Sequence, residues 1–504
     1  MKKAEKSESF VNSLYVLSLL AEDKVKQNIA IDIFSEYFQY EDSKTSKNET
    51  ELKTISIYQD PMRRKGNRPV SGTSWSPGIG ERISIAYCSP NFLESLDDPC
   101  KDGFVFDVTN PIDYLYRLEA SSSLTTIQHN PKEEMQIAAG QYDGHIAWWD
   151  IREKIQTNCM VSSEGHKDPV YNVIWTNSKT NSELMTTSSD GVVKFWDVRN
   201  LKASVDKFII DAKNKSLECP GNLLDASPAS FLEYEMTIPS KYMIGTEGGK
   251  VYTCSRKARY QADTITAEFA GHFGPIRCLQ RNPNFTKYFL TAGDWSAKIW
   301  ADDVFDSPVF WIKCGTELIT NGCWSTVRPS LFFLSRMDGV IEGWDIIYQQ
   351  KAPMLSQQIH KGPIHCLAMH SKGDLLLAGQ DDGSVSMLNL TESLANVEKE
   401  EKAAFLQLLD RETRREKVLE GIQREKKLKQ KGEKGLRSAV AKLRVIGTGN
   451  LINSNEETEA SKAEKKMLDE TTAKFQLSIQ SSIDARRREG KKSVYGEEFQ
   501  PTQM

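Results

Sequence analysis

Hydrophobic and polar positions alternate in short runs through the middle of the chain, and successive runs end alike. Residues 141–150 read QYDGHIAWWD and residues 188–197 read SSDGVVKFWD, so an Asp-Gly pair precedes an apolar run that closes on Trp-Asp. The tryptophan follows the aspartate by six residues in both runs. The same spacing recurs at Asp294–Trp300, Asp338–Trp344 and, with leucine as the last residue, Asp382–Leu388. Runs of this length between turn residues are typical of β-strands.

Seven hairpin turns divide the residues from 51 to 392 into repeating units. They fall at Asp102-Gly103, Asp143-Gly144, Asp190-Gly191, Gly248-Gly249, Asp294-Trp295, Asp338-Gly339 and Asp382-Gly383. Asp-Gly between β-rich runs suits a two-residue type I′ turn, in which both central residues have positive φ. A repeat of about 40–45 residues is the mark of a WD-repeat propeller. We therefore predict an all-β seven-bladed WD-repeat propeller over residues 51–392, flanked by N- and C-terminal α-helical extensions.

The two ends of this domain suggest how the ring closes. The seventh unit ends at Leu390 and the chain then becomes charged and helical, so its outermost strand is missing on the C-terminal side. Residues 54–58 (TISIY) form a short β-branched run ahead of the first unit. Because sheet proteins avoid exposed strand edges, we expect this run to pair as the outer strand of the seventh blade.

The N-terminal extension, residues 1–50, has a helical pattern and carries candidate partner-binding residues. One apolar stripe at helical spacing contains Phe10, Leu14, Leu17 and Ala21, and a second contains Ile31, Phe34, Tyr37 and Phe38. Apolar stripes of this kind need a surface to pack on. Two alternatives stay open at this point, namely the flank of the propeller itself and a partner subunit.

The C-terminal extension, residues 393–504, is highly charged. From 398 to 444 it has fifteen lysines and arginines against nine aspartates and glutamates, with a thin apolar stripe that includes Phe405, Leu409, Leu419 and Ile422. This composition predicts a helix that packs against another surface and does not fold alone. We expect the helix from about 401 to 431 to stay outside the propeller, to dock on a neighbouring subunit or on a heavy chain, and to bind an acidic partner through Arg411, Arg414 and Arg415. A second helix is expected from about 456 to 488.

The polar residues of the repeats fit a structural role better than a catalytic one. His166, Thr186, Asp190 and Trp196 stand where WD repeats place a hydrogen-bonded chain that satisfies a buried imidazole and indole. His272, Asp294 and Trp300 repeat most of this set, with Thr291 one position off. Trp149 and Trp344 close two further units. We assign these residues to folding and expect no catalytic residues.

Composition and the motifs of the chain argue against several other functions. The net charge is −4 and the isoelectric point about 6.1, so neither a nucleic acid nor an anionic membrane is indicated as a partner. No apolar run approaches the ~20 residues that span a bilayer, and the start of the chain does not read as a signal peptide. The nine cysteines form no CxxC pair. No GxxxxGK[ST] phosphate loop occurs, and His360, His365 and His370 are not spaced to converge on a metal. We expect no cofactor and no metal.

Several segments resemble one family in positions where a common fold would not dictate the sequence. They are residues 28–38 (NIAIDIFSEYF), 140–152 (GQYDGHIAWWDIR), 166–175 (HKDPVYNVIW), 271–283 (GHFGPIRCLQRNP), 289–300 (FLTAGDWSAKIW) and 411–426 (RETRREKVLEGIQREK). In these the chain is similar to the intermediate chains of axonemal outer-arm dynein, of the intermediate chain 2 type. Members usually have a longer segment before the 28–38 run. Residues 445–504 depart from the family's acidic ending, so their partner stays open.

The resemblance implies a non-catalytic subunit at the base of the outer dynein arm in the ciliary axoneme. Such a subunit pairs with a second WD-repeat intermediate chain, holds the tail of a heavy chain with its propeller and carries light chains, of the roadblock type among others, on its N-terminal segment. Contact with a docking complex or the microtubule is a further possibility. Two alternatives are a different WD-repeat adaptor, such as a ligase substrate receptor or chromatin platform, and an enzymatic propeller with inward carboxylates or histidines.

Overall fold

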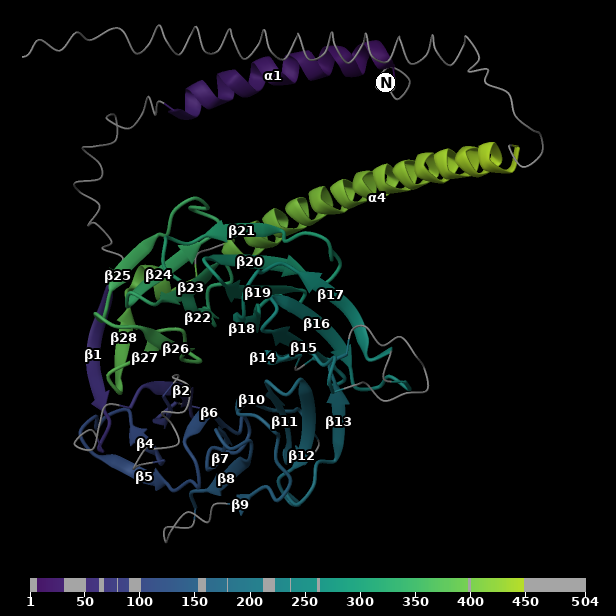
Figure 1. Cartoon of the computed structure of the whole chain (residues 1–504). Coiled ribbons are helices and arrows are strands. Elements are labelled where there is room, and N and C mark those ends of the chain that lie inside the picture. The colour runs from purple at the N-terminus through teal and green to yellow at the C-terminus, as the bar shows by residue number, and fades with distance from the viewer. Residues whose placement is uncertain are drawn as a thin grey trace, which may run out of the picture. The chain divides into compact units, whose positions relative to one another are not determined.

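The computed structural model describes residues 7–30, 51–62, 68–78, 80–89, 101–152, 160–178, 180–211, 223–235, 237–260, 263–397 and 400–447. Within these ranges the chain forms seven four-stranded antiparallel sheets, the blades of a β-propeller (Figure 1). The innermost strands of neighbouring blades contact one another around a closed ring. The predicted seven-bladed propeller is confirmed.

Each blade is a meander whose first strand lies innermost. Blade one contains β2 (Val70–Trp75), β3 (Arg82–Tyr87), β4 (Gly103–Asp107) and β5 (Tyr114–Leu118). Blade two contains β6 (Leu124–His129), β7 (Gln136–Gln141), β8 (Ile146–Asp150) and β9 (Met160–Val161). Blade three contains β10 (Val170–Trp175), β11 (Glu183–Ser188), β12 (Val192–Asp197) and β13 (Asp206–Ile209). Blade four contains β14 (Ala229–Tyr234), β15 (Lys241–Thr246), β16 (Lys250–Ser255) and β17 (Ile265–Ala270).

The remaining blades follow the same order, except the last. Blade five contains β18 (Ile276–Arg281), β19 (Tyr288–Gly293), β20 (Ser296–Ala301) and β21 (Phe310–Lys313). Blade six contains β22 (Ile319–Trp324), β23 (Leu331–Arg336), β24 (Val340–Asp345) and β25 (Leu355–Gln358). Blade seven contains β26 (Ile364–Met369), β27 (Leu375–Gln380) and β28 (Ser384–Leu390), with β1 (Leu52–Gln59) as its outer strand. The described helices are α1 (Glu8–Ala30), α3 (Glu392–Ala395) and α4 (Glu401–Gly447).

The ring closes by joining the two ends of the domain. β1 pairs antiparallel with β28, from Leu52 opposite Leu390 to Gln59 opposite Ser384, and the two strands lie side by side in Figure 1. Tyr58 is buried, and its hydroxyl donates a hydrogen bond to the carbonyl of Val108 at 2.9 Å. Residues 54–58 therefore occupy the outer-strand position of blade seven that their sequence suggested.

The Asp-Gly turns differ from the expected type I′ geometry. Only their glycines have positive φ, for example 87° at Gly144 and 72° at Gly191. The glycine N–H donates to the residue three positions earlier, as Gly191 does to Ser188 at 3.3 Å. This is a type I turn followed by a left-handed residue, which Asp-Gly serves equally well. Asp102-Gly103 is not a tight turn, since β3 ends at Tyr87 and β4 begins only at Gly103.

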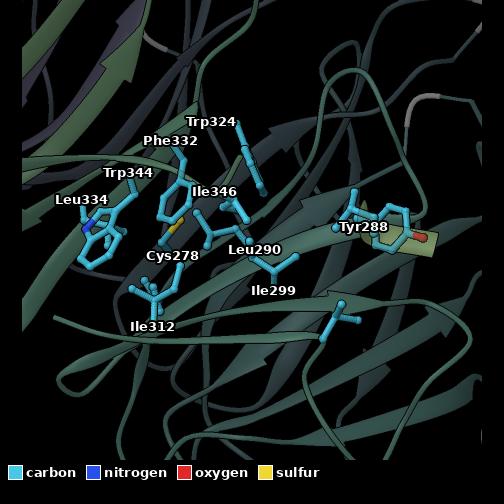
Figure 2. Close-up of a cluster of buried hydrophobic side chains, with 14 of the residues drawn as sticks. Cys278, Tyr288, Leu290, Ile299, Ile312, Trp324, Phe332, Leu334, Trp344 and Ile346 are labelled. Atoms are coloured by element: carbon cyan, nitrogen blue, oxygen red, sulfur yellow. The ribbon is translucent and has the colours of Figure 1, made fainter. Parts of the chain in front are cut away.

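The hydrophobic core lies between adjacent blades, because alternate residues of each strand point towards each neighbour. The cluster shared by blades five and six shows the arrangement, with side chains from both sheets meeting across the gap (Figure 2). It includes Tyr288, Leu290, Ile299, Trp324, Phe332 and Trp344. The same cluster contains Phe405 and Leu409 of α4.

The start of α4 thus packs on the propeller, and the expectation that this helix stays outside it is wrong. Phe405 and Leu409 lie one helical turn apart and are fully buried against the cluster of blades five and six. The chain divides into two compact units, Met1–Ile422 and Gln423–Met504. The first unit therefore includes the first part of α4.

Candidate partner-binding site on the C-terminal helix

The polar residues of blade three form one continuous chain of hydrogen bonds. The indole Nε1 of Trp196 donates to Thr186 Oγ1 at 2.9 Å, which leaves the threonine hydroxyl to donate to Nε2 of His166, also at 2.9 Å. Nδ1 of His166 then carries the proton that faces Asp190 Oδ2 at 3.1 Å. Burial acts to raise the pKa of Asp190, but the hydrogen bonds from His166 and from backbone N–H groups outweigh it and lower that pKa.

Blade five repeats this chain of hydrogen bonds, but its histidine lies further from the aspartate. His272 Nε2 lies 2.9 Å from Thr291 Oγ1, and Trp300 Nε1 donates to the same oxygen at 3.0 Å. Thr291 is not displaced in space, because it pairs with Lys298 as Thr186 pairs with Lys194. His272 Nδ1 lies 3.8 Å from Asp294. Burial lowers the pKa of His272 to about 4, so the imidazole is neutral in the folded protein.

The tryptophans of blades six and two use other acceptors. Trp344 Nε1 donates to Glu342 at 2.9 Å, and Arg336 forms an ion pair with the same carboxylate at 2.6 Å. Trp149 Nε1 donates to the carbonyl of Glu119 at 3.1 Å. These hydrogen bonds join strands and turns of the blades, and the Thr186 hydroxyl is buried and bonded to both Trp196 and His166.

A second set of tryptophans, at the ends of innermost strands, was missed as a group by the sequence reading. Trp75, Trp175 and Trp324 donate their indole N–H to carbonyls of Ala368, Gln128 and Gln280 in the preceding blade, at 3.1 to 3.3 Å. These three bonds join blades one, three and six to the blades that precede them in the ring. Their signal was an apolar run ending in tryptophan, as in residues 170–175 (VYNVIW).

The central channel is lined by such inter-blade contacts and has a volume of about 430 Å³. Gln128 and Gln280 accept backbone N–H groups of Trp175 and Trp324 at 3.1 and 2.8 Å. Glu233 accepts the N–H of Arg281 in the same way at 3.1 Å, and burial raises its pKa to about 7. Glu233 is the single carboxylate among the described residues that line the channel, and no histidine joins it. The described lining therefore lacks the ring of acid–base groups that an enzymatic propeller needs.

The remaining histidines and cysteines do not gather into a metal site within the described ranges. His365 and His370 lie 3.1 and 3.0 Å from the separate carboxylates of Asp381 and Asp374, and His360 lies 3.7 Å from Asp382. The six cysteines in the described part of the chain are buried thiols, with no disulfide among them. No helix among the described residues is long and apolar enough to cross a membrane.

The helix α4 is fixed to the propeller by a buried ionic cluster at its first residue. The guanidinium of Arg328 lies between Asp345, at 2.5 Å, and Glu401, at 3.2 Å, and all three side chains are almost fully buried. Ser330 donates a further hydrogen bond to Glu401 at 2.8 Å. Removing one member of such a buried cluster leaves an uncompensated charge, which is strongly destabilising.

Polar contacts continue along the same face of α4 for five turns. Tyr288 donates to Asp410 at 3.1 Å, and Glu416 accepts a hydrogen bond from Ser307 at 2.7 Å. Glu420 accepts the backbone N–H groups of Phe305 and Asp306, both at 3.1 Å. The segment from 401 to 420 is therefore a rigid part of the propeller unit.

The predicted arginines of α4 lie away from this docked face. Arg411, Arg414 and Arg415 are exposed, and Arg411 and Arg415 share the carboxylate of Glu412 at 2.8 and 3.2 Å. Val418, Leu419 and Ile422 follow them and are exposed as well. The structure thus brings three basic and three apolar side chains together on an open surface of one helix.

The N-terminal candidates are described only in part. Phe10, Leu14 and Leu17 lie on α1 and are exposed. The other predicted contacts, Ile31, Phe34, Tyr37 and Phe38, lie outside the described residues, as does the helix expected from about 456 to 488.

Two family models match the chain. The model described as "Dynein axonemal intermediate chain 3 WD40 domain" matches residues 205–390. The model described as "WD domain, G-beta repeat" matches residues 157–197, which contain the complete polar chain of blade three.

Individual relatives cover most of the chain. "Dynein intermediate chain 3, ciliary" of Heliocidaris crassispina is 39% identical over 432 residues, 86% of this chain and 71% of the relative. "Dynein axonemal intermediate chain 2" of Mus musculus is 38% identical over 434 residues, 86% of this chain and 68% of the relative. "Dynein, 70 kDa intermediate chain, flagellar outer arm" of Chlamydomonas reinhardtii is 33% identical over 443 residues, 87% of this chain and 76% of the relative.

Proposed function

The chain belongs to the family of axonemal dynein intermediate chains, and from this membership we propose that it is a non-catalytic subunit of the ciliary outer dynein arm. The observation that carries the proposal is the extent of the similarity, which covers 86–87% of the chain in relatives from Heliocidaris crassispina, Mus musculus and Chlamydomonas reinhardtii. The Chlamydomonas relative is named for the flagellar outer arm.

The architecture supports a scaffold and gives no support to a catalyst. The polar chain of blade three links structural elements, since Trp196 donates to Thr186 on the neighbouring strand and His166 connects that threonine to Asp190 at the turn. A rigid propeller presents loops at both rims, where binding residues concentrate in proteins. We propose that these rims hold the tail of a dynein heavy chain, beside a second WD-repeat intermediate chain.

The two extensions supply further contacts in this proposal. The N-terminal segment, with Phe10, Leu14 and Leu17 exposed on α1, binds light chains, roadblock-type chains among them. Ile31, Phe34, Tyr37 and Phe38 extend the same apolar character along the sequence. Arg411, Arg414 and Arg415 on α4 bind an acidic partner in the arm, the docking complex or the microtubule surface.

Extraction of axonemes tests this function directly. Detergent-stripped axonemes release outer-arm dynein in high salt, and the extract is separated on a sucrose gradient. We expect the chain to leave the doublets with the heavy chains and to sediment with them as one particle. Retention on the salt-washed doublets, or sedimentation apart from every heavy chain, contradicts the proposal.

A further inference from the structure

The surface of α4 divides into two faces with different uses. The face that carries Phe405, Leu409, Thr413 and Glu420 is buried against blades five and six. At 3.6 residues per turn, residues 411, 415, 418 and 422 follow one another along a single stripe on the opposite side of the helix. We call Arg411, Arg415, Val418 and Ile422 the outer stripe.

The described part of the propeller leaves the apolar residues of the outer stripe exposed. The side chains of Val418 and Ile422 are 62% and 43% exposed, and Leu419 next to them is 40% exposed. A helix that only borders solvent is polar on its open side, so a cluster of three large apolar residues there is unusual. Packing of α4 on its own blades does not require these residues, because Phe405 and Leu409 already satisfy that contact.

The charges beside the apolar residues indicate which kind of partner surface can bind the outer stripe. Arg411, Arg414 and Arg415 contribute three positive charges, and Glu412 supplies one carboxylate that both Arg411 and Arg415 contact. The stripe therefore keeps an excess of positive charge one to two helical turns before its apolar residues. Charged groups across an interface are arranged to complement one another. A matching surface has apolar residues with an acidic cluster one to two turns away.

We propose that the outer stripe binds an acidic amphipathic α-helix of another subunit of the dynein arm. Two parallel or antiparallel helices place apolar residues at intervals of three and four against each other, and Leu419 and Val418 stand three and four residues before Ile422. Because α4 is held by Arg328 and Glu401 at its start and by Glu420 further along, the stripe is presented in a fixed orientation. A pre-ordered helix loses little entropy on binding.

This inference rests on the proposed function for the identity of the partner complex, and the experiment separates the two. The full chain is expressed in ciliated cells with p-benzoylphenylalanine in place of Val418 or Ile422, and arms are purified, irradiated and mapped by mass spectrometry. We expect a crosslink to a helical peptide of another arm subunit that has at least two acidic residues within about two turns of the crosslinked residue. A chain that is absent from purified arms overturns both the proposed function and the inference.

Several results contradict the inference alone. Incorporation of the chain into arms without any crosslink from either position is one. A crosslink to the chain's own propeller or to its own residues 456–488 is another. A crosslink to tubulin, or to a partner segment without acidic residues, also overturns it, since the chemistry of the occupant is then different.

Charge reversal gives a second, quantitative readout. The double variant Arg411→Glu, Arg415→Glu is expected to weaken binding of the crosslinked partner fragment at least tenfold, and acidic-to-arginine changes in that fragment are expected to restore it. Lys402→Glu is the matched control, an exposed lysine on the same helix outside the stripe, and is expected to bind as the unchanged chain does. An equal loss in the control, or no loss in the double variant, sinks the proposal. Thermal unfolding of each variant shows whether the propeller is intact, and Arg→Gln changes replace any variant that is not.

Discussion

At the scale of single residues, two kinds of aromatic side chain occur at the repeated positions of the blades. Some are buried and stabilise the fold, and others are exposed to solvent. Trp196 is fully buried and its indole is hydrogen-bonded to Thr186. Phe273 follows His272 at the position that Lys167 takes after His166, and its side chain is 99% exposed. The two residues make the same backbone contact, because Phe273 and Lys167 both donate their N–H to the aspartate of the next turn.

We expect Trp196→Ala to lower the free energy of unfolding by about 3–5 kcal/mol, the usual result of removing a buried aromatic side chain. Phe273→Lys, which copies blade three, should change it by less than about 0.5 kcal/mol. Chemical denaturation of both variants measures this. Full stability of Trp196→Ala together with loss of partner binding would show that the tryptophan is a contact residue and not a structural one.

Stability should also fall in acid because of the buried histidines. His272 has a pKa of about 4 when folded, against 6.5 as its ordinary value, so the unfolded chain binds an extra proton between these pH values. The free energy of unfolding is therefore highest above pH 6.5, where His272 is neutral in both states. It decreases as the pH falls from 6.5 towards 4, because only the unfolded chain gains the proton. We expect His272→Gln to reduce the loss of stability between pH 7 and pH 5 by about 2 kcal/mol. Parallel curves of stability against pH for the two proteins would contradict this assignment.

At the scale of elements, the sequence predicted the strands well and the helix contacts poorly. The spacing of Asp190 to Trp196 and its repeats fixed the blades, because each repeat builds the same local hairpin. The Asp-Gly pair could not distinguish two turn types that both need a left-handed glycine. The docking of α4 was missed because Phe405 and Leu409 suit any apolar surface, and the surface they meet, including Tyr288 and Trp324, comes from distant parts of the chain.

Because α4 is docked on the propeller, removing the docked part of this helix should lower the stability of the propeller. Deleting residues 400–504 removes Phe405, Leu409 and the Glu401 partner of Arg328, so we expect the melting temperature of the propeller to fall by several degrees or more. Deleting residues 423–504 leaves all of these contacts in place and should leave the melting temperature unchanged. Calorimetry of the two truncated proteins compares them, and equal melting temperatures would mean that the helix does not stabilise the propeller.

At the scale of the whole molecule, the ring is held shut by a strand from the opposite end of the domain. β1 completes blade seven through its pairing with β28, and Tyr58 reaches from that strand to Val108 beside blade one. Ring closure therefore depends on β1, which precedes the first blade in the sequence.

Deletion of residues 1–60 should destabilise the entire propeller, because it removes β1 and also Asp60, the buried partner of Arg68 at 2.7 Å. Deletion of residues 1–45 should not, since β1 begins at Leu52. Limited proteolysis and thermal melting of the two proteins give the comparison. If both deletions are equally stable, blade seven closes without β1 and this description of the ring is wrong.

The central claim, that this propeller is an assembly subunit of the outer dynein arm, is tested most directly by electron tomography of axonemes from cells in which its gene has been removed. We predict doublets that lack the outer row of arms while the inner row persists, with the outer row restored when the full chain is re-expressed. A complete outer row in the absence of the chain would contradict the account.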